Sequence, residues 1–304
     1  MAKNLRVLGA AGLLALLAAC SPGGGAPALQ QTMVGPPLSE AEAAEVIAEV
    51  NEAIDQAYRD LDSELLEEVA GGSLLQRSIA EIEQRSASSD VAAESREYTD
   101  PQFVIPRNGL WWMADAAVAG ADSRELLTFA HSGQGQWLLV SAITLETDLP
   151  TIATDEHGNA LTAPLDDTAS RILPKDAAAA YTDLWATGGD GPGSPLAATA
   201  LGEDIRERRS SDDPLLVTGY MPTTPESTRT WVLRTEEGGT VAVGHVAHTK
   251  TVSAIAVPGA AGSEYSADPR TPVRTHHSGE VAMWLPASDF PEILGAELAE
   301  IPAG

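Results

Sequence analysis

Four histidines of the C-terminal half are the residues whose chemistry most suggests a metal site. His245, His248, His276 and His277 fall in two segments with the composition of strands. Imidazole nitrogens bind Zn²⁺ or Cu²⁺ when three or four of them converge. Side chains on a strand alternate between its faces, so His245 and His248 point in opposite directions, as do His276 and His277. At best one histidine of each pair meets its counterpart, and we therefore predict hydrogen-bonded or exposed histidines, no bound metal and no cofactor.

Motifs of the common enzyme classes are missing from the sequence. It contains no G-x-S-x-G elbow, no S-x-x-K pair and no kinase signature. The glycine-dense segment 188–193 does not match G-x-G-x-x-G, and Ser194 stands where a phosphate-binding loop would need lysine. Acid–base catalysis needs two carboxyl groups in different environments, which the sequence cannot single out among 44 Asp and Glu. The sequence therefore predicts no catalytic residue and favours a protein that is not an enzyme.

The N-terminal segment has the features of a secretory signal. Lys3 and Arg6 precede an uncharged apolar run over residues 7–19. This run of thirteen residues is too short to span a bilayer, which needs roughly 20 apolar residues. We predict that residues 1–19 are a leader that is removed after export.

The one cysteine of the sequence follows this run directly. Leu17, Ala18, Ala19 and Cys20 resemble the lipobox of bacterial lipoprotein precursors, in which an aliphatic residue and two small residues precede cysteine. The resemblance implies cleavage before Cys20, a diacylglycerol on its thiol, and anchoring to the extracytoplasmic face of the cell membrane. Two acyl chains give stable anchoring, whereas one gives only marginal binding. The alternatives are a plain signal peptide with an incidental cysteine and a free buried thiol.

Composition narrows the range of partners. The 304 residues include 44 Asp and Glu against 18 Lys and Arg, which gives a formal net charge of −26. Nucleic-acid binding rests on Lys and Arg that neutralise phosphates, so nucleic acid is excluded as a partner. Residues 20–38 are rich in Gly and Pro and indicate a flexible tether. The expected partners are the membrane, through the lipid anchor, and another protein of the cell envelope.

The first folded segment is expected over residues 39–150. Ser39 and Glu42 form a capping box, which opens an amphipathic helix of about six turns. Two shorter helices follow, and four strands are expected between residues 102 and 144. Helices that precede an antiparallel run are typical of an α+β fold and disfavour a βαβ sheet.

The same order of elements then repeats. Residues 151–172 lack periodicity and indicate a linker, and a second domain is expected over residues 173–304. Helices over about 176–186 and 194–209 precede strands between about 215 and 285. A short match between residues 57–61 and 180–184 supports duplication. We predict an α+β fold of two tandem helix-then-antiparallel-sheet units.

Helices packed on a curved antiparallel sheet resemble the cystatin-like and NTF2-like α+β folds in element order. The lipobox, the tether and the two α+β halves together resemble an uncharacterised family of actinobacterial lipoproteins. This likeness is carried most by segments 233–239, 280–286 and 294–297. It implies a domain of unknown function and transfers no catalytic residue.

These features favour a lipid-anchored, non-enzymatic binding or accessory module of the bacterial cell envelope. One alternative is an NTF2-like isomerase or hydrolase, which a deep pocket holding a desolvated acid or histidine would indicate. Another is a solute-binding lipoprotein. That class needs two lobes around a cleft, and the non-βαβ order counts against it.

Overall fold

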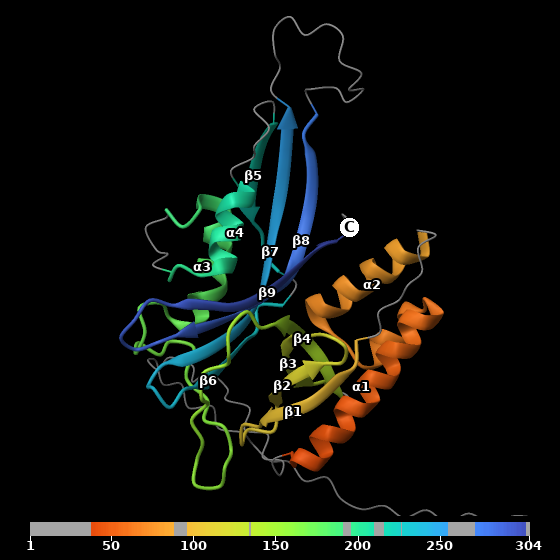
Figure 1. Cartoon of the computed structure of the whole chain (residues 1–304), viewed down its shortest axis with the longest axis vertical. Coiled ribbons are helices and arrows are strands. Elements are labelled where there is room, and N and C mark those ends of the chain that lie inside the picture. The colour runs from red at the N-terminus through yellow and green to blue at the C-terminus, as the bar shows by residue number, and fades with distance from the viewer. Residues whose placement is uncertain are drawn as a thin grey trace, which may run out of the picture. The chain divides into compact units, whose positions relative to one another are not determined.

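Helices precede antiparallel strands in each half of the chain, so the fold is α+β with two helix-then-sheet units (Figure 1). The computed structural model describes residues 38–87, 96–133, 135–190, 196–209, 216–225, 227–254 and 271–301. The described residues all belong to one compact unit.

The first half places three helical segments before a four-stranded sheet. They are α1 (Glu40–Asp60), the 3-10 helix η1 (Ser63–Glu68), α2 (Gly72–Ala87), β1 (Tyr98–Val104), β2 (Trp111–Val118), β3 (Arg124–His131) and β4 (Trp137–Thr144). The strands pair antiparallel in the order β1-β2-β3-β4. The predicted capping box is confirmed, because the Glu42 amide donates to the Ser39 hydroxyl and the Ser39 amide donates to the Glu42 carboxylate.

The second half repeats this order with a larger sheet. Its elements are the 3-10 helix η2 (Pro174–Asp176), α3 (Ala177–Thr187), α4 (Ala200–Arg209), β5 (Leu216–Pro222), β6 (Thr230–Arg234), β7 (Thr240–Ala254), β8 (Val273–Leu285) and β9 (Glu292–Ile301). The strand order is β5-β7-β8-β9, and β6 also pairs with β7. α4 begins at Ala200, later than the predicted start at 194, and residues 196–199 that precede it are irregular.

Side chains alternate between the two faces of each strand, so the buried apolar residues form three separate cores. These cores lie between successive layers of helices and sheets. Trp112 and Phe129 of the first sheet pack with α1 and α2, and their rings stack with centroids 4.0 Å apart. Met113, the neighbour of Trp112 on β2, faces the other way and packs in a core shared with Val241 of β7. Ala242, the next residue on β7, packs with α3 and α4. Each sheet is therefore covered by helices on one face and by the other sheet on the opposite face.

Residues 151–163, within the predicted linker, lie along β6. Isolated bridges join Ile152 to Thr235 and Thr162 to Leu233. Within the described ranges, no helix is both long enough and apolar enough to cross a membrane.

Candidate functional site

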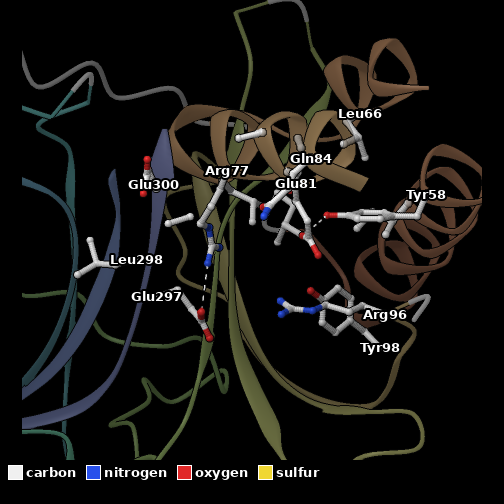
Figure 2. Close-up of a pocket in the computed structure, with 17 residues that line it drawn as sticks. Tyr58, Leu66, Arg77, Glu81, Gln84, Arg96, Tyr98, Glu297, Leu298 and Glu300 are labelled. Atoms are coloured by element: carbon white, nitrogen blue, oxygen red, sulfur yellow. Dashed lines mark hydrogen bonds and ion pairs between the residues drawn. The ribbon is translucent and has the colours of Figure 1, made fainter. Parts of the chain in front are cut away.

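A cavity of about 320 Å³ lies between the two N-terminal helices and strand β9 (Figure 2). Its apolar lining includes Ile54 of α1, Leu74 of α2 and Leu298 of β9. The charged and hydroxyl-bearing side chains that line it include Tyr58, Arg77, Glu81, Arg96, Tyr98 and Glu297. The cavity is therefore amphiphilic, and both halves of the sequence contribute to it.

Helical spacing places the polar groups of α2 on one face. Ser73, Arg77, Glu81 and Arg85 follow one another at intervals of four residues, which puts them on the same side of the helix. Arg77 and Glu81 point from α2 toward the cavity (Figure 2). Leu74 and Ile82 are buried beside them and hold this side of the helix against the first sheet.

One cluster at the cavity joins α1 to α2. The Tyr58 hydroxyl donates to Glu81 Oε2 at 2.8 Å, and Arg85 Nη2 donates to Glu81 Oε1 at 2.6 Å. The Arg85 guanidinium lies over the Tyr58 ring, 5.2 Å from its centroid. Burial and the neighbouring Glu81 carboxylate raise the pKa of Tyr58 to about 12. The phenol therefore remains a hydrogen-bond donor at neutral pH.

Arg77 joins α2 to both sheets. Its guanidinium lies 3.3 Å from Glu297 Oε2 on β9 and 3.2 Å from Glu280 Oε2 on β8. It also donates to the Ala142 carbonyl on β4 at 3.3 Å. The second oxygen of Glu297 accepts a 2.7 Å hydrogen bond from the Thr144 hydroxyl. These contacts fix the position of β9 beside the cavity.

Arg96 brings a second guanidinium to the cavity. It lies 3.4 Å from Glu125 Oε1, and the Tyr98 hydroxyl donates to Glu125 Oε2 at 3.1 Å. Burial raises the pKa of the Glu125 carboxyl, although Arg96 opposes the shift. Arg96 itself is 48% exposed, whereas Glu125 is 4% exposed. Glu125 lines a neighbouring hollow that shares Tyr58, Glu81 and Arg96 with the cavity.

A buried cluster lies beside the cavity, at the N-terminal end of α2. The Ser73 hydroxyl lies 2.6 Å from His245 Nδ1 and 2.6 Å from Glu280 Oε1. Ser73, His245 and Glu280 are each no more than 5% exposed. In a Ser-His-acid triad the acid contacts the histidine, whereas here it contacts the serine. This arrangement, closed to solvent, connects α2 to β7 and β8.

The structure separates the four histidines that were candidate metal ligands. His248 and His277 stack with centroids 5.0 Å apart, beside Trp185 of α3. His245 contacts Ser73 instead, and His276 Nδ1 lies 3.1 Å from the Thr249 hydroxyl. Across the part of the chain that is described, no three His, Cys, Asp or Glu side chains are arranged to hold a metal ion.

The lipidation candidates Leu17, Ala18, Ala19 and Cys20 lie outside the described residues. The residues that line the cavity lie within the described ranges, and no sequence motif marks them as a site. The nearest hint of the cavity in the sequence is Arg77, a charged residue one turn after Ser73 that lies beside the apolar stripe of α2. Glu297 belongs to β9, a strand that the sequence pattern did not predict.

The fold and the cavity define an α+β protein whose two sheets pack face to face, with an amphiphilic cavity beside their junction. A family model described as a domain of unknown function, DUF8094, matches residues 34–300, and the chain belongs to this family. The resemblance to an uncharacterised lipoprotein family is thereby confirmed.

A relative from Streptomyces coelicolor is named an uncharacterised lipoprotein. It is 27% identical over an alignment of 240 residues, and the match covers 71% of this chain and 66% of the relative. The chain thus spans just under two thirds of that relative's length. No solved structure matches the chain, so the likeness to the NTF2 and cystatin folds stays a prediction.

Proposed function

We propose that this protein is a lipid-anchored, non-enzymatic binding module of the bacterial cell envelope, and that the cavity beside α2 holds a small ligand. The segment from Leu17 to Cys20 and the name of the Streptomyces relative support the anchor. The anchor would hold the described body at the extracytoplasmic face of the membrane.

The observation that carries the binding role is the cavity itself. Its volume of about 320 Å³ falls at the lower end of the range for small-molecule sites, which is roughly 300–1,000 Å³. It combines an apolar lining with a few convergent polar groups, as such sites do. Both halves of the sequence line it, which is a feature that the solute-binding alternative also requires.

The lining carries Arg77 and Arg96 against Glu81, Glu297 and Glu300, so binding of a small organic anion depends on the arginine that is half exposed, Arg96. Arg77 is engaged with Glu280, Glu297 and the Ala142 carbonyl. Arg96 is half exposed, and its guanidinium has five N–H donors. It can therefore contact a carboxylate or phosphate of a ligand while it keeps its ion pair with Glu125. An apolar part of the same ligand would rest on Leu74 and Leu298.

An enzyme in the manner of the NTF2-like isomerases is the second candidate, and Glu125 is the observation that favours it. Burial raises the pKa of this carboxyl, as a general acid or base in a pocket would require. Both of its oxygens are already engaged, one by the Tyr98 hydroxyl and the other by Arg96. Both contacts stabilise the ionised carboxylate, and Glu125 lines the neighbouring hollow and not the cavity, so we favour binding over catalysis.

Thermal unfolding of the full-length chain with a panel of anions tests the binding role. Succinate, glutamate, glycerol 3-phosphate and inorganic phosphate serve as probes, because a ligand of the native state raises its stability. We expect at least one of them to raise Tm by several degrees. The rise should be lost in Arg96→Gln and kept in Arg107→Gln, a control at an exposed arginine outside the cavity. No rise with any of the four, or an equal rise in Arg96→Gln, would show that the proposal is wrong.

A further inference from the structure

Exposed apolar side chains gather on one projecting part of the second sheet. Figure 1 shows β5, β7 and β8 extending past α3 and α4. We call residues 216–222, 248–254 and 273–277 the arm; they are β5 and the parts of β7 and β8 beside it. Seven large apolar residues of the described chain are exposed, and four of them lie on the arm: Leu216, Val217, Met221 and Val273. Val217 and Met221 are 55% and 63% exposed.

β5 has an open edge that lacks the usual protection. It pairs with β7 on one side, and in the described ranges no strand pairs with its other side. Such an edge presents unpaired N–H and C=O groups, which proteins commonly guard with charged side chains, proline or a bulge. β5 contains no charged residue, and its register with β7 has no shift from Leu216 to Pro222. Its one proline, Pro222, stands at its last position.

The charge of the arm is opposite to that of the protein. The formal net charge of the chain is −26, yet the arm carries Lys250 and Arg274 and no Asp or Glu. Arg208 and Arg209 of α4 are close enough to Tyr220 of β5 to act on it electrostatically. Glu300 of β9 stands opposite His277 of β8 in the strand register. β7 and β8 lie between β9 and β5 in the sheet. α4 also carries Glu203, Asp204 and Glu207, and Arg208 pairs with Asp204, so the excess of positive charge belongs to the arm itself.

We propose that β5 is a docking edge for an extended, acidic segment of a partner protein, which adds to the sheet as one more strand. Main-chain hydrogen bonds to β5 would supply affinity in this mode, and alternate side chains would supply specificity. Val217 and Met221 lie on the same face of β5 and would contact apolar residues of the segment. Lys250, Arg274 and Arg209 would attract its acidic residues.

Two other occupants fit the arm less well. A lipid bilayer would leave the open backbone edge without hydrogen-bond partners, and such edges do not occur in the hydrocarbon region of membranes. A second copy of the chain would bring two basic arms together, at the cost of like-charge repulsion. An acidic strand satisfies both the backbone edge and the charge.

Selection from a displayed library of random ten-residue peptides tests this proposal, with the full-length Cys20→Ser chain as bait. We expect the selected peptides to be enriched in Asp and Glu and poor in Pro. A synthetic copy of one such peptide should slow hydrogen exchange at backbone amides of β5 by about tenfold or more. Selected peptides that are not enriched in Asp and Glu, or a peptide that leaves hydrogen exchange at the β5 amides unchanged, would overturn the proposal.

Charge-reversal variants test whether the arm itself binds the peptide. Lys250→Glu with Arg274→Glu should weaken peptide binding by about tenfold, whereas Lys175→Glu, at an exposed lysine away from the arm, should leave it unchanged. Val217→Glu with Met221→Glu should also weaken binding, because both side chains are exposed and their exchange leaves the core intact. Equal binding by the parent protein and both double variants would overturn the proposal.

The same measurements distinguish an acidic strand from the two other occupants. Self-association that protects β5, or protection by phosphatidylglycerol vesicles without any peptide binding, would overturn the proposal. Arg96→Gln should leave peptide binding unchanged, so a failure of the cavity ligand would not be mistaken for a failure of the docking edge.

Discussion

Ser73 on α2 and His245 on β7 meet at 2.6 Å between Oγ and Nδ1, although 172 positions separate them in the chain. Gly72, which directly precedes Ser73, has a φ of +63°, a backbone conformation that favours glycine, and a Cβ there would lie 3.3 Å from His245 Cε1, so the imidazole would have to shift slightly. The N-terminal end of α2 is thus held against the second sheet, while the rest of the helix packs on the first. α2 therefore links the two halves, and Arg77 extends this link to β9.

Removal of Arg77 should destabilise the protein strongly. Arg77→Met would leave Glu280, which is fully buried, without its ion-pair partner. We expect the free energy of unfolding in urea to fall by about 3–5 kcal/mol. Arg85→Met is the matched control on the same helix, since its ion pair with Glu81 is partly exposed and should be worth about 1 kcal/mol or less. The double variant Arg77→Met with Glu280→Gln should recover part of the loss, and equal effects of the two single variants would contradict this role for Arg77.

Two buried histidines should make the protein less stable in mild acid. Burial lowers the pKa of His245 and of His248 to about 4, so the folded state resists protonation that the unfolded state accepts near pH 6.5. Their contribution is therefore present above pH 6.5 and is lost as pH falls toward 4. Each histidine adds at most about 1.4 kcal/mol per pH unit to the slope of stability against pH.

The variant His248→Phe isolates one of these contributions. His248 lies among Trp185, Tyr220 and His277, and its Nδ1 has no hydrogen-bond partner among the described residues, so an apolar ring suits the site. Denaturation between pH 4 and 7 should show a flatter slope than in the parent protein. His157→Asn, at an exposed turn, provides the control. An unchanged slope in His248→Phe would show that this histidine is not protonated on unfolding.

Close approach of β8 to β9 should make Gly279 intolerant of a side chain. A Cβ on Gly279 would collide with the Glu297 carbonyl of β9. We expect Gly279→Ala to lower the free energy of unfolding by at least about 2 kcal/mol and to weaken ligand binding, because Glu297 lines the cavity. Gly133→Ala, where an added Cβ meets nothing within 4 Å, should change neither quantity by much. A fully stable Gly279→Ala variant would refute this close packing.

Local patterns predicted the elements of this fold better than they predicted its assembly. The capping box at Ser39 and Glu42 and the apolar spacing after it marked the start and the buried face of α1 correctly. Strand alternation also explains why His248 meets His277 while His245 does not. These features depend on residues close together in sequence or directly opposite across one pair of strands.

The cavity could not be predicted in the same way. Segment 292–301 is rich in Glu, Ala and Leu, which favour helices, yet pairing with β8 makes it strand β9. Its residue Glu297 meets Arg77, which is 220 positions away. The partner of Arg77 was therefore fixed by tertiary packing, and nothing near Arg77 in the sequence identifies it.

Mass spectrometry of the protein purified from the membrane fraction of its bacterial host tests the central claim, a binding module anchored by lipid, most directly. We predict a chain that begins at Cys20 and carries the mass of a diacylglycerol on that residue. The variant Cys20→Ala should lack this mass and leave the membrane fraction. A chain with an unmodified Cys20, or one that keeps residues 1–19 and is found in the cytosol, would contradict the account.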